Sequence, residues 1–166
     1  MRKKIGMFGK SIGAGVLIML LASSLSMAAD SFNMDMNVTG TGISFNTVVE
    51  EDPWDNSEMD VGTTNESAIN QVNIDNTGSV AIDVKCAASD SVDWTIESTI
   101  GADEFRLDCK ENAAGAYAEL GTTAITVYNN LGVGVNKDFR FKFYMPSSST
   151  AYGPEQSTVT FSVVAH

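Results

Sequence analysis

Oxygen ligands for a hard cation crowd into one short stretch of this sequence. The eleven residues EEDPWDNSEMD, beginning at Glu50, hold seven carboxylate or amide side chains. Asp52, Asp55, Glu58 and Asp60 could together offer the oxygen ligands that Ca²⁺ prefers. Their spacing is not that of an EF-hand loop, so the alternative is a solvated acidic loop. We expect weak Ca²⁺ binding at most, and no other cofactor.

Residues for covalent or acid–base catalysis are sparse. The single histidine, His166, stands at the end of the sequence, and no third cysteine is present to act as a nucleophile. The stretch 132–134, Gly-Val-Gly, is too short for a phosphate-binding loop. Paired carboxylates such as Asp103 and Glu104 would serve a glycosidase only if they faced each other across a cleft. We predict that the protein is not an enzyme and takes no small-molecule substrate.

The two cysteines predict a disulfide. Cys86 and Cys109 each end a run in which apolar residues alternate, so both side chains are expected in the core. An even number of cysteines in a secreted chain usually forms disulfides. The alternatives are two buried free thiols or a zinc site, for which further ligands are lacking.

The first 28 residues are typical of a secretory signal peptide. A basic start at 2–4 precedes an apolar run of 14 residues, Ile12–Leu25, and small residues follow at Ser26 and Ala28. The run is short for a membrane span. A retained anchor is one alternative, and a type IV prepilin, cleaved further upstream and keeping a helical stem, is another. We expect a secreted, cell-surface protein that begins near Ala29 and has no stable membrane span.

The expected mature chain is strongly acidic. It has about 138 residues, enough for one domain, with six basic and 21 acidic side chains and hence a formal net charge of −15. Such a surface lacks the basic footprint that nucleic acids and anionic lipids require. We therefore expect no nucleic-acid partner. Asn37 and Asn65 each begin an N-glycosylation sequon, and Asn37 should point outward.

Alternating apolar residues predict an all-β protein. The sequence favours about nine strands, and strands of this kind in one domain indicate an antiparallel β-sandwich of the Ig-like or jelly-roll type over 42–166. Ile43, Phe45 and Val48 are expected to face inward, and Lys110–Gly121 is the one place where a short helix could form. Trp54 should either cover an end of the sandwich or contact another subunit. The predicted strands lie near 31–39, 42–49, 72–75, 80–86, 92–96, 104–109, 124–130, 138–145 and 157–165.

The first of these strands raises the main question about function. Four apolar residues alternate with polar ones, and each would contribute about 1.5–3 kcal/mol if fully buried. Gly40 and Gly42 follow as a flexible joint within the segment 29–41. The strand could form a tight hairpin with 43–49, or it could reach into a neighbouring copy. Its apolar residues are Phe32, Met34, Met36 and Val38.

Several stretches together resemble a known group of proteins. The alternating N-terminal strand, VNIDNTGSVAIDVKC, GADEFRL and FKFYMP…STVTFSVVA are similar to secreted β-sandwich filament proteins. That group includes the TasA/camelysin-like biofilm-matrix proteins and the archaeal bundling-pilus subunits. The resemblance implies that an N-terminal donor strand, here about 31–39, completes the sandwich of the next subunit. The cysteine pair has no counterpart in that pattern.

The favoured function is therefore a structural subunit of an extracellular filament, pilus or biofilm-matrix fibre. Its partner would be another copy of the same chain, in a head-to-tail polymer. The first alternative is a monomeric secreted module that binds carbohydrate or calcium. A type IV pilin-like subunit is the second alternative. The candidate sugar-stacking residues are Trp54, Tyr117, Tyr128 and Tyr152.

Overall fold

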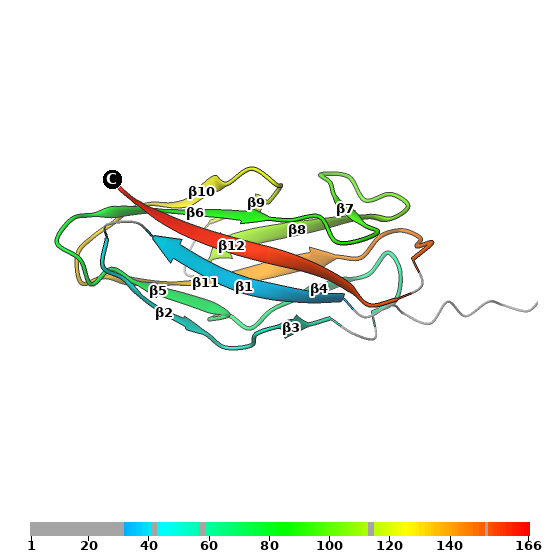
Figure 1. Cartoon of the computed structure of the whole chain (residues 1–166), viewed down its shortest axis with the longest axis horizontal. Helices are drawn as coiled ribbons and strands as arrows, with labels where there is room; N and C mark the ends of the chain where they lie inside the picture. Colours follow the sequence, from blue (N-terminus) through cyan, green and yellow to red (C-terminus); the bar gives the residue numbers. More distant parts are fainter. Residues whose placement is uncertain (1–31, 41–42, 57–58, 113–114, 152) are drawn as a thin grey trace, which may run out of the picture.

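The structure is a computed structural model that describes residues 32–40, 43–56, 59–112, 115–151 and 153–166. Twelve strands and no helix occur in this part of the chain, and the strands form two facing sheets (Figure 1). Most neighbouring strands are antiparallel. The predicted all-β sandwich is confirmed.

Sheet A has five strands in the order β10-β6-β12-β1-β3. Four of them have seven or more residues, and β3 contains only two. β1 is parallel to β12, whereas the other strand pairs of this sheet are antiparallel. The bounds are Phe32–Gly40 for β1, Trp54–Asp55 for β3, Ile82–Ala88 for β6, Ile125–Leu131 for β10 and Glu155–Ala165 for β12.

Sheet B has seven strands. Five follow the order β2-β5-β11-β8-β7, while β4 pairs with β11 and β9 pairs with β8. The strands β11 and β8 form its centre. The bounds are Asn46–Val49 for β2, Thr64–Glu66 for β4, Val72–Asp75 for β5, Thr95–Ile96 for β7, Glu104–Glu111 for β8, Ala118–Glu119 for β9 and Asn136–Tyr144 for β11.

Aromatic side chains fill the space between the sheets. Alternate residues of β11 are buried phenylalanines, as a strand with one buried face requires. Phe139 and Phe141 of sheet B contact Phe161 of sheet A, with ring centroids 5.3 and 5.9 Å apart. Aromatic pairs at this spacing stabilise a core beyond the area that they bury.

The segment 76–79 connects the two sheets. The strands before and after it, β5 and β6, do not form a hairpin, because they belong to opposite sheets. Asn76 is fully buried at this crossing, and its amide Nδ2 donates to the carbonyl oxygens of Val80 and Leu131, both at 2.9 Å. The alternation that predicts strands near 72–75 and 80–86 does not show that the chain changes sheet between them.

Other local predictions are wrong. Of the described residues in the predicted strand 42–49, Asn46–Val49 form a strand. Val48 does not face inward: its side chain is 57% exposed, on a strand at the edge of sheet B. Val92 is 85% exposed and precedes β7 instead of belonging to it. The short helix that 110–121 could form is absent from the residues that the structure describes there, where β8 ends and β9 pairs with it.

Candidate functional site

The first strand lies inside its own domain. β1 runs parallel to β12 from the pair Phe32–Glu155 to the pair Gly40–Val163, and Figure 1 shows β1 in blue beside β12 in red. The hairpin with 43–49, one of the two alternatives for this strand, does not form, because β2 pairs with β5 in the opposite sheet. We call the position between β12 and β3 that β1 fills the first-strand site.

The alternating pattern of β1 matches its burial. Phe32 and Met34 are fully buried, and Met36 is 8% exposed. Val38 is only partly buried at the edge of the core, so it contributes less than the other three. The strand is therefore anchored at its N-terminal half. Gly40 ends β1, whereas Gly42 lies outside the described residues.

Three aromatic rings surround Phe32. Its ring is stacked on Phe143 at a centroid distance of 4.3 Å and an interplanar angle of 10°. It is also stacked on Trp94, at a centroid distance of 5.6 Å and an interplanar angle of 11°. Phe105 contacts it at 5.1 Å with a tilt of 53°. We call Trp94, Phe105 and Phe143 the aromatic slot, because they enclose one ring contributed by β1.

An acidic segment covers the outer edge of β1. The segment 50–56, which we call the clasp, includes β3, the two-residue strand that pairs with Asn33 and Met34. The backbone N–H of Asn56 donates to the carbonyl of Phe32 at 2.9 Å. The backbone N–H of Met36 donates to the Asp52 carboxylate at 3.2 Å. These bonds satisfy backbone groups that β12 leaves unpaired.

The clasp is fixed to the body of the domain at several points. Gln71 donates its side-chain amide to the carbonyl of Glu51 at 2.6 Å, and the N–H of Glu50 donates to the carbonyl of Gln71 at 3.0 Å. Trp54 is buried, with its ring 6.3 Å from that of Phe141. Of the two expectations for Trp54, the structure supports the one in which it covers part of the sandwich.

The three candidate calcium ligands that the structure describes, Asp52, Asp55 and Asp60, do not form one cluster. Asp52 binds the Met36 N–H, Asp55 lies on β3, and Asp60 uses its carbonyl to accept from Thr63. Glu58 lies outside the described residues. No group of three or more acidic, histidine or cysteine side chains suited to a metal ion occurs in the described part of the chain. Among these candidates, the Asp52 carboxylate has a structural contact at the edge of β1.

The two cysteines lie in opposite sheets, on β6 and β8, and both are buried. They are free thiols in this structure, which differs from the predicted disulfide. The side chains nevertheless meet: burial raises the pKa of the Cys86 thiol, and a hydrogen bond with Cys109 raises it further.

The glycosylation candidates differ in accessibility. Asn37 is exposed on the outer face of sheet A, as predicted. Asn65 is half-buried on β4, and its amide donates to the Asn56 side chain at 2.9 Å. A glycan on Asn65 would have to break that bond, so Asn37 is the better acceptor.

The aromatic residues proposed for sugar stacking are mostly engaged. Trp54 is buried, and Tyr152 lies outside the described residues. Lys110 lies over the ring of Tyr117 at 4.6 Å, and Lys137 lies over the ring of Tyr128 at 5.0 Å. Burial also raises the pKa of Tyr117 to about 12.

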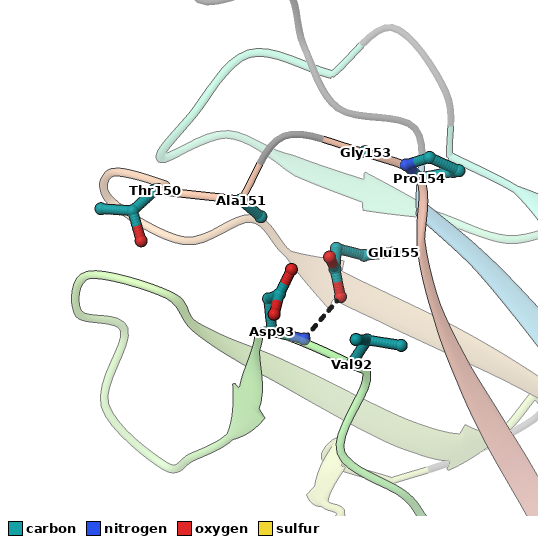
Figure 2. A pocket seen from close by; sticks show the side chains of 7 residues that line it. All are labelled: Val92, Asp93, Thr150, Ala151, Gly153, Pro154 and Glu155. Atoms are coloured by element: carbon teal, nitrogen blue, oxygen red, sulfur yellow. Dashed lines mark hydrogen bonds between the residues drawn. The ribbon is translucent and has the colours of Figure 1, made fainter.

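A cavity of about 420 Å³ opens where β12 begins, beside the start of β1 (Figure 2). Glu155 is buried there and accepts a hydrogen bond from the backbone N–H of Asp93 at 3.0 Å. Sequence reasoning did not single out either residue, since they are 62 positions apart. The lining residues are Val92, Asp93, Thr150, Ala151, Gly153, Pro154 and Glu155.

No family model matches this sequence, and no curated protein matches it either. Among the described residues, no helix is long and apolar enough to cross a membrane. What the fold and the site define is a β-sandwich that is completed by its own first strand.

Proposed function

We propose that the protein is a structural subunit of an extracellular filament, such as a pilus or biofilm-matrix fibre. In the filament, the first strand of each subunit fills the first-strand site of the next one. The proposal is supported by the signal-peptide pattern, by the acidic surface and by the position of β1. Its only required partner is another copy of the chain.

The observation that carries the proposal is the way in which β1 is attached. β1 pairs with β12, and paired residues such as Phe32 and Glu155 are 123 positions apart in the sequence. The strand that follows β1 in the chain, β2, belongs to sheet B. The chain connection of β1 to the rest of the sandwich runs through Gly40, Thr41 and Gly42. A second copy could therefore supply the same strand, with the same backbone pairs and the same buried side chains.

The energetics favour neither arrangement strongly. Burying Phe32, Met34 and Met36 stabilises the sandwich by roughly 5–9 kcal/mol before the cost of ordering the strand. This gain is the same whether the strand comes from its own chain or from a neighbour. Strand exchange therefore depends on concentration, and because it is head-to-tail, it extends without closing.

An engineered disulfide that can be reduced again tests this proposal. Asn37 and Thr160 are opposite each other in the register of β1 and β12, and neighbouring strands lie within the Cα spacing that a disulfide spans. The double variant Asn37→Cys/Thr160→Cys, oxidised as a monomer, ties β1 to its own domain. We expect it to stay monomeric by light scattering and electron microscopy, and to form fibres after reduction.

The matched control ties two strands that are not exchanged. Lys85 and Ser162 are opposite each other on β6 and β12, so Lys85→Cys/Ser162→Cys should form fibres in both redox states. Fibres from the oxidised Asn37→Cys/Thr160→Cys variant would rule out assembly through β1. Failure of the wild-type protein to polymerise at any concentration would favour the monomeric binding module.

The monomeric module remains the second candidate because β1 fills the first-strand site of its own chain. A carbohydrate-binding version of it lacks support, since Trp54 is buried and the rings of Tyr117 and Tyr128 are each covered by a lysine. Screening the monomer against oligosaccharides and Ca²⁺ would test this alternative directly.

A further inference from the structure

We propose that the aromatic slot is a binding site for one planar aromatic side chain of an incoming strand, namely Phe32 of a second copy. The slot selects which strand is accepted and fixes its register. This inference rests on the proposed function, and it adds that the Phe32 ring is the part of the incoming strand that is recognised.

The geometry of the slot suits a flat ring. Trp94 and Phe143 lie within 11° of the Phe32 plane on stacked contacts, so they form two nearly parallel walls. Phe105, tilted by 53°, contacts the same ring. All four rings are fully buried. An aliphatic side chain of similar volume is thicker than a ring, and it would fit such parallel walls poorly.

Hydrogen bonds hold one wall in place. The indole Nε1 of Trp94 donates to the Ser149 hydroxyl at 2.9 Å, and its backbone N–H donates to the Ser91 hydroxyl at 3.0 Å. Phe143 is held in the middle of sheet B by pairing with Leu107 on one side and Asn65 on the other. The walls are thus positioned by contacts that do not involve β1.

The sequence of the strand offers only one side chain for the slot. Phe32 is the single aromatic residue between Ala29 and Gly42. A shift of one residue would place Asn33 in the slot, and a shift of two would place Met34 there. The first buries an amide and the second puts a flexible side chain between parallel rings. The slot therefore allows one register, the one seen here.

Chemical rescue of the full-length chain tests the slot without any exchange. We expect Phe32→Ala to lower Tm by roughly 10–20 °C and to leave an apolar cavity. Toluene, a flat ring, should raise that Tm by several degrees, whereas methylcyclohexane should raise it much less. The control variant Met36→Ala leaves the slot filled and should not respond to toluene.

Peptide binding then tests recognition of an incoming strand. A labelled peptide covering residues 30–41 should bind the Phe32→Ala chain at least tenfold more tightly than the same peptide with leucine at position 32. If the Phe32→Ala chain does not fold, Phe32→Leu, which keeps most of the side-chain volume, serves as the receiving chain.

The outcomes separate the two proposals. Equal rescue by toluene and methylcyclohexane, or equal binding of the two peptides, would overturn ring recognition while leaving strand exchange intact. Rescue by toluene with no binding of either peptide would overturn strand exchange and, with it, the intersubunit role of the slot.

Discussion

Asp103 is a single residue on which the aromatic slot depends indirectly. Its carboxylate accepts from both the hydroxyl and the backbone N–H of Thr150, each at 2.7 Å. The neighbouring Ser149 accepts the hydrogen bond from Trp94. These bonds to Thr150, the hydroxyl first, lower the pKa of the Asp103 carboxyl below its ordinary value.

The lowered pKa gives a pH dependence with a defined sign. A carboxyl whose folded-state pKa is depressed stabilises the fold above its unfolded pKa of about 4, and this contribution disappears as the pH falls through the folded value. We expect Asp103→Asn to lower Tm at pH 7 and to match the wild type near pH 2. Asparagine tolerates the positive φ of 55° at this position.

Thermal unfolding across this pH range measures the effect. The exposed Glu97→Gln change is the matched control, and it should leave Tm unaltered at both ends. A difference between wild type and Asp103→Asn that persists unchanged at pH 2 would contradict the assignment.

The cysteine pair predicts sensitivity to the redox state. We expect oxidised glutathione, present during folding, to take two hydrogens from Cys86 and Cys109 and join them, because the side chains meet across the core. The bond should stabilise the fold by about 3 kcal/mol. Intact mass and Tm, each with and without reductant, measure this; a double Cys→Ala variant should not respond. A chain that stays reduced after oxidative folding would exclude the bond.

At the residue level, the sequence identified the buried side chains of β1 but not the aromatic slot that receives Phe32. Alternation alone placed Phe32, Met34 and Met36 in the core, because a strand with one buried face has a period of two. The slot could not be predicted in this way. Trp94, Phe105 and Phe143 come from three separate segments, and their meeting depends on how the two sheets face each other.

At the level of elements, the clasp lies along the outer edge of β1. Its bonds to Phe32 and Met36 lie on the edge of β1 away from β12. For the strand to leave, both bonds and the pairing with β3 must break. Of the acidic residues that suggested a calcium site, Asp52 therefore has a structural use at this edge.

Removing the Asp52 carboxylate should loosen the strand. We expect Asp52→Ala to lower stability by roughly 1 kcal/mol, because the N–H of Met36 loses a charged acceptor that is partly screened by solvent. Hydrogen exchange at the Met36 amide should become faster, and fibres should form sooner. Glu51→Ala removes the same charge while keeping the carbonyl that Gln71 binds. If both variants behave alike, net charge and not the clasp is responsible.

The sequence predicted most elements but not all of their partners. Strands with clear alternation, such as β6, β8, β11 and β12, lie close to their predicted positions. The parallel pairing of β1 with β12 was not predicted, because alternation gives a strand's faces and not its neighbours. For the same reason, alternation could not show that β5 and β6 lie in different sheets.

At the level of the whole molecule, charge should govern the rate of assembly. Subunits cleaved near Ala29, as the signal-peptide pattern predicts, would carry a formal net charge of −15 and repel one another over a Debye length of about 30 Å at 10 mM salt and about 8 Å at 150 mM. We expect fibre growth, followed by light scattering, to accelerate as sodium chloride is raised across this range. Slower growth at higher salt would indicate that attractive ion pairs hold the subunits together.

The most direct test of strand exchange is cross-linking between two differently labelled copies. One copy carries Asn37→Cys on β1 and the other carries Thr160→Cys on β12, so a matched pair exists only when a strand from one copy lies in the other. We expect a cross-linked heterodimer after mixing and mild oxidation. We expect none when the second copy carries Thr126→Cys on β10, two strands away from β12. Equal cross-linking in the two mixtures, or none in either, would contradict assembly through the first strand.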